Sequence, residues 1–384
     1  MARFTLPRDL YHGKGAMEAL KTFEGKKAIV CVGGGSMKRF GFLDKAVGYL
    51  QQAGMEVKIF DGIEPDPSVE TVMRGAAAMA EFEPDWIVAI GGGSPIDAAK
   101  AMWIKYEYPD ITFEEMCKVF GIPKLRQKAR FCAISSTSGT ATEVTAFSII
   151  TDYDKGIKYP IADFEITHDV AIVDPELAET MPKKLVAHTG MDAMTHAIEA
   201  YVSTAANVLT DSAALMAVKM IYQYLPKAVA NGDYMWARDK MAYAQYLAGI
   251  AFNNASLGYV HAMAHQLGGY YNLPHGVCNA ILLPYVEEFN LIGNLNRFRD
   301  LAEAMGEKVE GLSTGDAAAK AIQAIRTISR QVGIPANLKV LGVKPEDFEV
   351  MAENAMKDVC CLTNPRKATR EQIIEIYRRA YEGE

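Results

Sequence analysis

The hydrophobic pattern of this chain changes near residue 182, and no other feature constrains its fold as strongly. Before that point, short apolar runs rich in β-branched residues are bounded by Gly, Pro or Asp, and helical stretches separate the first four. This alternation is typical of βαβ units, so we predict a parallel sheet. The predicted strands are residues 28–32, 57–60, 86–90, 131–134 and 170–173.

Two domains of different class are expected. Residues 145–151 and 158–166 flank a short polar turn that ends in Gly156, which predicts an antiparallel hairpin. After residue 182 only long helical runs remain, such as 211–224, 239–252 and 314–332. Because 384 residues exceed the size at which a single core usually stops growing, we predict an α/β domain at 1–182 and an all-helical domain at 183–384.

Composition argues against several classes of protein. The net charge of −7 and the sequence pI of about 5.6 disfavour nucleic acid or an anionic membrane as a partner, and the basic run 124–130 is expected to be a solvated loop. No run of about eighteen apolar residues occurs, and the first residues do not resemble a signal peptide. The six cysteines form no Cys-x-x-Cys motif, which is typical of reduced thiols in a cytoplasmic protein.

Glycine-rich turns directly follow two of the predicted strands. These turns are Gly33-Gly34-Gly35-Ser36 and Gly91-Gly92-Gly93-Ser94. Glycine allows the backbone to approach a ligand closely, and N–H groups at the start of a helix favour phosphate. Such turns also occur without a ligand, but the polar run 135–143 follows another strand in the same manner. Three turns of this kind at the carboxyl ends of parallel strands predict a nucleotide crevice, although neither triplet is a Walker A loop.

Four of the seven histidines lie between residues 196 and 275, and Asp192 joins them in a second pattern. Asp192 and His196 are four residues apart, and His261 and His265 repeat this spacing. Residues four apart share one face of a helix. Two such pairs on facing helices, with His275 on the following loop, can converge on one cation. One carboxylate and several imidazoles suit Fe²⁺ or Zn²⁺ rather than Mg²⁺ or Ca²⁺.

A His-x-x-x-His pair is more often part of a helix surface or a satisfied core pair than part of a metal site. Here, however, both runs are rich in Ala, Met and Gly, and an unpartnered Asp192 among apolar neighbours would be costly. No lysine or arginine occurs in 188–202 or 250–280. A bound cation is therefore the simplest balance for the carboxylate.

These motifs together resemble the iron-dependent, group III alcohol dehydrogenases along essentially the whole chain. The combination of Gly-Met-Asp-x-x-x-His, His-x-x-x-His and Pro-His-Gly at these spacings is highly specific. The resemblance implies a Rossmann-like dinucleotide-binding domain followed by an all-helical metal-binding domain. The matching segments are residues 91–100, 136–145, 173–175, 190–201 and 258–284.

The resemblance also implies roles for individual residues. Fe²⁺, or else Zn²⁺, would act as a Lewis acid on the substrate oxygen while hydride passes between a small alcohol or aldehyde and nicotinamide. His265 would be a catalytic residue that does not bind the metal. The implied metal ligands are Asp192, His196, His261 and His275. The residues expected along the cofactor are Gly34, Gly35, Ser36, Lys38, Gly92, Gly93, Ser94, Asp97, Thr137, Thr140 and Lys158. The expected substrate pocket consists of Phe147, Phe252 and Cys360.

We predict NADP(H) rather than NAD(H) as the cofactor, with aldehyde reduction as the cellular direction. NAD sites commonly use a carboxylate to accept the ribose 2′-OH, whereas NADP sites use a cation. Asp61 would indicate NAD in a standard Rossmann fold. In the family resembled here, however, the discriminating turn follows the first strand, and NAD-preferring members carry an aspartate in it. This chain has no acid there, and Lys38 and Arg39 follow the glycines, although both cations are also consistent with a solvated helix.

Other functions fit parts of the pattern. A dehydroquinate-synthase-like lyase would need lysines and arginines near the metal, where this chain has none. NAD-dependent glycerol- or lactaldehyde-type dehydrogenases share the superfamily, although the context of His265 and His275 fits the iron group better. A non-catalytic metal-binding module would leave the glycine turns unexplained. A homodimer is expected from the resemblance alone.

Overall fold

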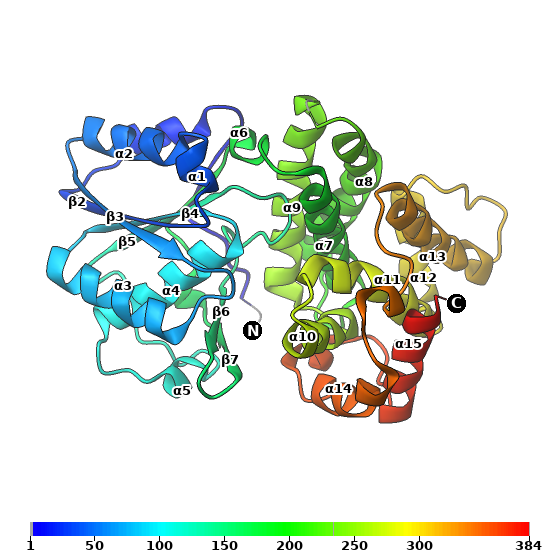
Figure 1. Cartoon of the computed structure of the whole chain (residues 1–384). Coiled ribbons are helices and arrows are strands. Elements are labelled where there is room, and N and C mark those ends of the chain that lie inside the picture. Colours follow the sequence, from blue (N-terminus) through cyan, green and yellow to red (C-terminus); the bar gives the residue numbers. More distant parts are fainter. Residues whose placement is uncertain (1–2, 233, 384) are drawn as a thin grey trace. The chain divides into compact units, whose positions relative to one another are not determined.

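The computed structural model describes residues 3–232 and 234–383, and the chain divides into two compact units. Unit 1 is Met1–Thr180 and unit 2 is Met181–Glu384. In the described residues every strand belongs to unit 1, and unit 2 is built of helices (Figure 1). The predicted fold class, an α/β part followed by an all-helical part, is confirmed.

Unit 1 is built around a six-stranded parallel sheet in the order β1-β8-β5-β4-β2-β3. All five predicted strands are present and are neighbours in this sheet. The register pairs Gly91, the last residue of β4, with Ser135, the last residue of β5, so the turns after these two strands start side by side. The strands are β1 (Asp9–His12), β2 (Lys27–Gly33), β3 (Glu56–Ile63), β4 (Trp86–Gly91), β5 (Arg130–Ser135) and β8 (Val170–Val173).

Helices cover both faces of this sheet. Alternate residues of each strand point to opposite faces, so neighbouring residues pack against different helices. Ile29 belongs to a core that includes α3 and α4, whereas Val30 belongs to a core that includes η1 and α2. Burial on both faces explains why the strands are continuous apolar runs in the sequence. Figure 1 shows α2 on one side of the sheet and α3 on the other. The helices of unit 1 are η1 (Ala16–Thr22), α1 (Ser36–Arg39), α2 (Phe42–Gln52), α3 (Val69–Phe82), α4 (Gly93–Glu107), α5 (Phe113–Met116), η2 (Phe164–Ile166) and α6 (Pro175–Ala178).

The predicted hairpin is present as antiparallel β6 (Phe147–Asp152) and β7 (Ile157–Ala162). The second strand is shorter than the predicted segment 158–166, since it ends at Ala162. Asp163 instead caps a short 3-10 helix, η2, by accepting a hydrogen bond from Glu165 N. The sequence prediction also missed β1. This strand is short and mostly exposed, and it is formed by pairing with β8 rather than by an apolar run of its own.

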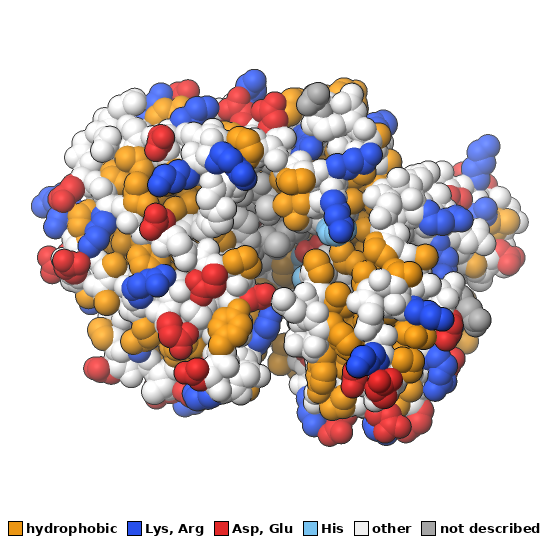
Figure 2. All heavy atoms as spheres, viewed as in Figure 1, with side chains coloured by type: hydrophobic (Ala, Val, Ile, Leu, Met, Phe, Trp, Pro, Cys, Tyr) orange, Lys and Arg blue, Asp and Glu red, His pale blue; other side chains and the backbone are white. Residues whose placement is uncertain are grey.

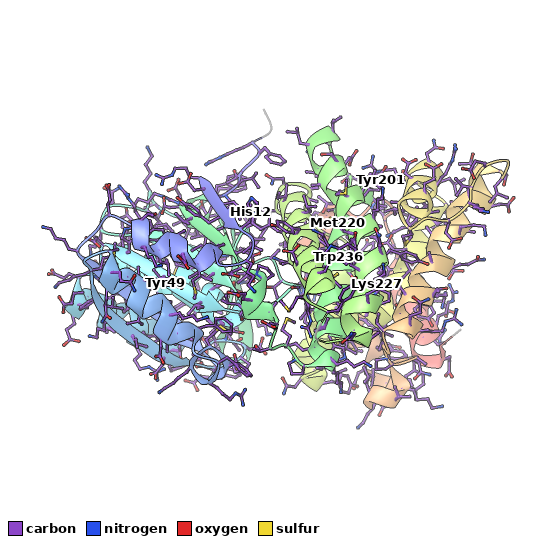
Figure 3. All side chains as sticks on the ribbon, turned by 90° about the horizontal axis from the view of Figure 1, so that it is seen from above. His12, Tyr49, Tyr201, Met220, Lys227 and Trp236 are labelled. Carbon is purple, nitrogen blue, oxygen red and sulfur yellow. The ribbon has the colours of Figure 1, made fainter. Side chains whose placement is uncertain are left out.

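Unit 2 contains the predicted runs 211–224 and 239–252 within the longer helices α8 (Val208–Ala230) and α9 (Met235–Ala255), whereas the run 314–332 corresponds to α13, which ends at Gln331. Helices α8 and α9 pack against each other. Trp236 of α9 stands edge-on to Tyr224 of α8, with their ring centroids 4.7 Å apart, and Lys227 of α8 lies over the Trp236 ring. Figure 3 labels Lys227 and Trp236 on these two helices. The helices of this unit are α7 (Lys183–Val202), α8 (Val208–Ala230), α9 (Met235–Ala255), α10 (Tyr259–Tyr271), α11 (His275–Leu291), α12 (Leu295–Ala304), α13 (Thr314–Gln331), η3 (Lys339–Leu341), η4 (Pro345–Asp347), α14 (Phe348–Ala355), η5 (Val359–Thr363) and α15 (Arg370–Glu382).

The sequence contains similar numbers of basic and acidic residues, 40 Lys and Arg against 47 Asp and Glu. On the face shown in Figure 2, Lys and Arg side chains are interspersed with Asp and Glu side chains. Among the described residues, none of the helices combines the length and the apolar character needed to cross a membrane.

Candidate metal centre and nucleotide-binding turns

Helix α7 supplies the first two predicted metal-binding residues. Asp192 and His196 both lie in the buried part of α7, with only 3% and 5% of their surfaces exposed. Gly190 of the same motif is needed for packing, because a Cβ atom there would clash with the Leu225 side chain of α8. The motif therefore places polar groups inside unit 2 and keeps the neighbouring helix close.

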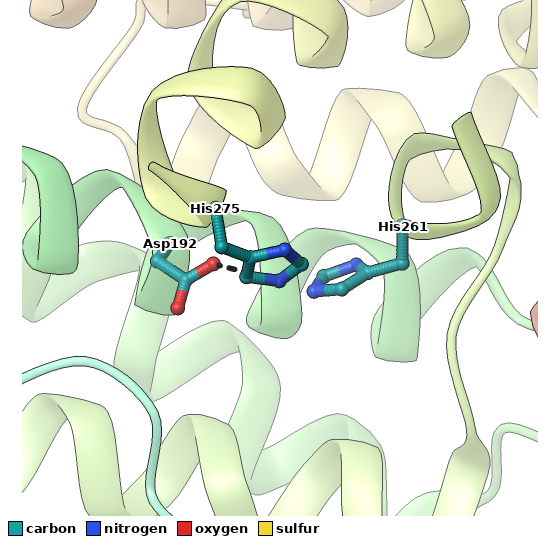
Figure 4. Close-up of side chains that lie close together, drawn as sticks. All are labelled: Asp192, His261 and His275. Atoms are coloured by element: carbon teal, nitrogen blue, oxygen red, sulfur yellow. Dashed lines mark ion pairs between the residues drawn. The ribbon is translucent and has the colours of Figure 1, made fainter. Parts of the chain in front are cut away.

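Three of the four predicted ligands converge. One ligand atom each from Asp192, His261 and His275 lies within 4.8 Å of the other two, and Asp192 Oδ1 is 3.7 Å from His275 Nε2 (Figure 4). His196 lies outside this group of three. Its ring stacks on the His261 ring, with the centroids 4.7 Å apart and the planes inclined by 18°. The three-residue group joins α7, α10 and α11.

His275 was expected on a loop but is the first residue of α11, with Pro274 in the preceding cap position. The next residue explains the Pro-His-Gly motif. A Cβ atom on Gly276 would clash with the carbonyl oxygen of His188 in α7 and would lie 2.9 Å from the carbonyl carbon. Glycine therefore allows the start of α11, and with it His275, to approach the backbone of α7.

Substituting Gly276 with alanine is expected to displace His275 and to weaken metal retention by at least tenfold. The obstacle is backbone, which cannot move aside as a flexible side chain can. The matched control is Gly269→Ala in α10, where an added Cβ atom would meet no atom within 4 Å. Metal content after dialysis against a chelator measures the effect. Equal retention in the two variants would contradict this role for Gly276.

Asn279, which the sequence prediction overlooked, contacts all three converging residues. Its Nδ2 atom lies 2.7 Å from Asp192 Oδ1, 3.1 Å from His261 Nε2 and 3.0 Å from His275 Nε2. Asn279 lies four residues after His275 on α11 and is fully buried. The spacing from His275 could have indicated this residue, since it repeats the interval already used for the two other pairs.

A buried carboxylate that the prediction also overlooked lies behind His261. Glu199 Oε2 is 2.5 Å from His261 Nδ1, and both side chains are almost completely inaccessible to solvent. Burial and the nearby Glu287 raise the pKa of Glu199 well above its ordinary value, whereas the hydrogen bond from Val260 N acts in the opposite direction and favours the carboxylate. Burial raises the pKa of Glu287 to about 8. Burial also holds the pKa of His261 well below its ordinary value, which favours the neutral imidazole that metal binding requires.

His265 is turned toward a different carboxylate. Its Nδ1 atom is 2.7 Å from Asp358 Oδ2, and a 35% exposed side chain makes it accessible to small molecules. Its ring stacks on that of His275 at 5.4 Å between centroids. Although burial acts in the opposite sense, the hydrogen bond from His265 lowers the pKa of Asp358.

Two predicted pocket residues also lie in this part of unit 2. Cys360 groups with His265 and Asp358, with one polar atom of each within 4.8 Å of the others. Burial raises the pKa of the Cys360 thiol well above its ordinary value, so the thiol stays protonated. Phe252 stacks on His196, with the ring centroids 4.3 Å apart. Phe147, the third pocket residue, begins β6 in unit 1.

In unit 1 the first glycine turn follows β2. Gly34 and Gly35 have φ angles of +64° and +71°, in the left-handed region that glycine adopts most easily. A Cβ atom at either position would meet no described atom within 4 Å, so the turn has open space beside it. Ser36 and Lys38 follow in the short helix α1.

The second glycine turn packs against the polar turn after β5. A Cβ atom on Gly92 would lie 3.3 Å from Thr137, and one on Gly93 would lie 3.5 Å from Thr140. The two turns are tied together by the hydrogen bond from Ser136 N to Gly91 O, at 2.8 Å. The structure thus brings Gly92 and Gly93 together with Thr137 and Thr140, and Ser94 follows in the first turn of α4.

Buried Lys100 holds the polar turn in place, a role that the sequence prediction did not assign. Its Nζ atom donates to the carbonyl oxygens of Thr142, Thr145 and Phe147 at 2.7–3.0 Å. A buried carbonyl that loses its donor costs about 1–3 kcal/mol, so this lysine is an important part of the turn. Burial lowers the pKa of Lys100 to about 8, whereas the nearby Asp97 acts in the opposite direction.

The remaining two predicted cofactor residues have protein partners. Asp97 Oδ2 accepts a hydrogen bond from Ile149 N at 3.2 Å, which ties α4 to β6. Lys158 on β7 forms an ion pair with Asp66 at 2.9 Å. Both side chains of this ion pair are about half exposed, and such a pair contributes only about 0–1 kcal/mol, so Lys158 is readily redirected toward a ligand.

Comparison with known families identifies the chain. Residues 7–175 match the model of iron-containing alcohol dehydrogenases, and residues 186–381 match the C-terminal model of the Fe-containing alcohol dehydrogenase family. This chain belongs to the iron-containing alcohol dehydrogenase family. The resemblance stated from the sequence motifs is thereby confirmed. The protein is an oxidoreductase of the alcohol dehydrogenase type that uses a nicotinamide cofactor.

Similar proteins match this family member over almost its whole length. The NADPH-dependent butanol dehydrogenase of Clostridium saccharobutylicum is 53% identical, over 100% of this chain and 99% of the relative. The 1,3-propanediol dehydrogenase of Klebsiella pneumoniae is 45% identical, over 99% of each chain. Among solved structures, a 1,3-propanediol oxidoreductase superposes with a TM-score of 0.95 at 44% identity, covering 99% of this chain and 100% of the other.

Proposed function

We propose that this family member is a metal-dependent reductase of small aldehydes, with NADPH as the hydride donor and Fe²⁺ as the metal. The observation that carries the proposal is the convergence of Asp192, His261 and His275 inside unit 2, in a chain of this family. Zn²⁺ fits the same donor set and is the alternative metal. The reverse reaction, alcohol oxidation, uses the same groups.

The donor set fits a divalent cation. Asp192 supplies an anionic oxygen, and His261 and His275 supply neutral nitrogens, which suits a borderline metal such as Fe²⁺. His196, stacked on His261, is the proposed fourth ligand. When bound, the metal supplies Lewis acidity toward the substrate oxygen. His265, held by Asp358, is then the proposed group for orienting the substrate or moving a proton at its Nε2 atom.

The proposed cofactor site is built from the three turns of unit 1. The glycines admit a backbone approach to phosphate, and the threonine hydroxyls lie beside the second glycine turn. We propose that the nicotinamide cofactor is held by Gly34, Gly35, Ser36, Lys38, Gly92, Gly93, Ser94, Asp97, Thr137, Thr140 and Lys158.

The preference for NADPH rests on the turn after β2. A Cβ atom on either glycine of this turn would meet open space, and the cations Lys38 and Arg39 follow in α1. Open space beside two positive charges is suited to a 2′-phosphate. Asp61 is exposed near the end of β3, the strand next to β2, and is the residue that would favour NADH. The relative named as NADPH-dependent is 53% identical, whereas a methanol dehydrogenase named as NAD-dependent is 41% identical. These observations support NADPH.

Introducing an acid at Gly34 is expected to shift the cofactor preference toward NADH by at least tenfold. An aspartate side chain there would repel the 2′-phosphate and accept a hydrogen bond from a 2′-hydroxyl. The measurement is kcat/KM for NADPH and for NADH in wild type and in Gly34→Asp. Gly34→Asn is the matched control, because Asn and Asp both tolerate the left-handed conformation but only Asp is charged.

A wild-type preference for NADH would overturn the proposed cofactor. An unchanged ratio in Gly34→Asp would place the discriminating group elsewhere, with Asp61 as the next residue to substitute. If Gly34→Asn changes the ratio as much as Gly34→Asp does, the effect is conformational and the electrostatic argument fails.

The proposed substrates are small, fairly apolar aldehydes and alcohols. Phe252 stacked beside His196 supplies an aromatic wall, and Phe147 and Cys360 are the other proposed pocket residues. Relatives named for butanol and for 1,3-propanediol support this size range. A panel of short aldehydes and alcohols, assayed with both cofactors on Fe²⁺- and Zn²⁺-loaded protein, tests the proposal. A uniform preference for charged or phosphorylated substrates would contradict it.

A homodimer is proposed from the family alone, and analytical sedimentation tests it.

A further inference from the structure

Glu199 connects α7 to the start of α10 through one buried carboxylate. Its Oε1 atom accepts a hydrogen bond from Val260 N at 2.7 Å, and its Oε2 atom contacts His261 Nδ1. Helix α10 has Gly258 in its N-cap position, and Gly258 has no side chain with which to cap the helix. The carboxylate of Glu199 therefore takes the place of a cap while it also contacts the neighbouring imidazole.

The approach of this carboxylate depends on a close fit. A Cβ atom on Gly258 would lie 2.8 Å from Glu199 Oε1 and 2.7 Å from Asn364 Oδ1. Asn364 Oδ1 in turn accepts a hydrogen bond from Tyr259 N. The first turn of α10 is thus held by two side chains from elsewhere in unit 2, and the glycine of the motif makes room for both.

The contacts around Asn279 decide which nitrogen of His261 carries the proton. A carboxylate only accepts hydrogen bonds, so the contact with Asp192 Oδ1 orients the Asn279 amide with its NH₂ group toward that oxygen. The same Nδ2 atom lies 3.1 Å from His261 Nε2. Because an amide NH₂ has no lone pair to offer, a proton on Nε2 would point at another N–H group at this distance, so the contact favours Nε2 without a proton. In a neutral imidazole the proton then lies on Nδ1, where Glu199 accepts it.

We propose that Glu199 is a positioning residue, which fixes His261 in the Nδ1-protonated form and aims its Nε2 lone pair at the metal. The inference rests on the proposed metal centre and adds a residue that acts through a ligand. Capping and positioning use the same carboxylate, so the start of α10 and the orientation of His261 are coupled. A carboxylate that accepts from the distal nitrogen of a histidine ligand typically contributes about 10- to 100-fold in metal affinity.

The test compares Glu199→Gln with Glu287→Gln in the full chain. The two oxygens of Glu199 contact Val260 N and His261 Nδ1, but a glutamine side chain has only one oxygen. In Glu199→Gln the amide NH₂ group therefore faces one of these two N–H groups and cannot accept its hydrogen bond. Glu287→Gln removes the neighbouring buried carboxyl without touching His261, and its partner Asn290 can still donate to the remaining oxygen. The metal dissociation constant is measured for Zn²⁺ by competition with a chromophoric chelator. We expect a loss of affinity of about 10- to 100-fold in Glu199→Gln and no change in Glu287→Gln.

Two further readouts separate positioning from capping. Nitrogen NMR of histidine-labelled wild type, with His261 assigned by its substitution, is expected to show protonated Nδ1 and unprotonated Nε2 without metal. Thermal unfolding of the metal-free variants measures how far Glu199 stabilises the fold when no metal is bound. A loss of stability in Glu199→Gln with an unchanged dissociation constant would overturn the proposal, and so would protonated Nε2 in wild type. Failure of wild type itself to bind metal would instead reject the metal centre.

Discussion

Replacing His261 with alanine is expected to abolish metal retention and turnover while cofactor binding persists. His261 is 2% exposed, contacts Asn279 through Nε2, and belongs to the group of three converging ligands. Without His261, the cation beside the buried Asp192 would lose one of its neutral nitrogen ligands. Because the proposed cofactor residues lie in unit 1, the binding of NADPH does not require this side chain.

Elemental analysis after gel filtration measures the metal, and the quenching of protein fluorescence by NADPH measures the cofactor. Gln266→Ala in the same helix is the matched control, since its side chain bonds only to the Ala262 carbonyl oxygen in the described structure. His196→Ala is predicted to behave as His261→Ala does, and it tests the fourth ligand separately. Full metal content in His261→Ala would remove this residue from the ligand set.

Replacing His265 with alanine is expected to leave the metal in place and to lower kcat by about 10²–10⁴-fold, the usual contribution of a positioned acid–base group. His265 lies four residues after His261 on α10, but its Nδ1 atom bonds to Asp358 rather than facing Asp192. The contact with Asp358 uses Nδ1, so Nε2 is the nitrogen proposed to act on the substrate, in a side chain that is 35% exposed. The proposed role in proton transfer or substrate orientation rests on this arrangement.

Metal content and kcat must be measured on the same preparation of His265→Ala. Loss of metal together with activity would make His265 a ligand and would displace one of the four proposed ligands. Unchanged kcat at full metal content would remove it from the catalytic machinery. Gln266→Ala again serves as the neighbouring control, because the two residues are adjacent on α10.

The strands of unit 1 and their parallel arrangement follow from the sequence for a local reason. A strand covered on both faces must be apolar at consecutive positions, and the runs that end at Val32 and Ile90 show this directly. The glycine turns are likewise visible, because positive φ angles at Gly34 and Gly35 favour one residue type. Helical spacing similarly places Asp192 with His196 on one helix face, before any tertiary contact is known.

The spacing of residues along one helix does not show which side chains from other helices contact them. Only the tertiary structure determined these contacts. Four-residue intervals treat His261 and His265 alike, yet one faces Asp192 while the other bonds to Asp358. Glu199 and Asn279 looked like ordinary helix residues, because their partners are 62 and 87 positions away in the chain. β1 was missed for the same reason, since its hydrogen bonds are made with β8. Local pattern records which face of an element is buried, whereas the partner across that face is set by how the elements pack.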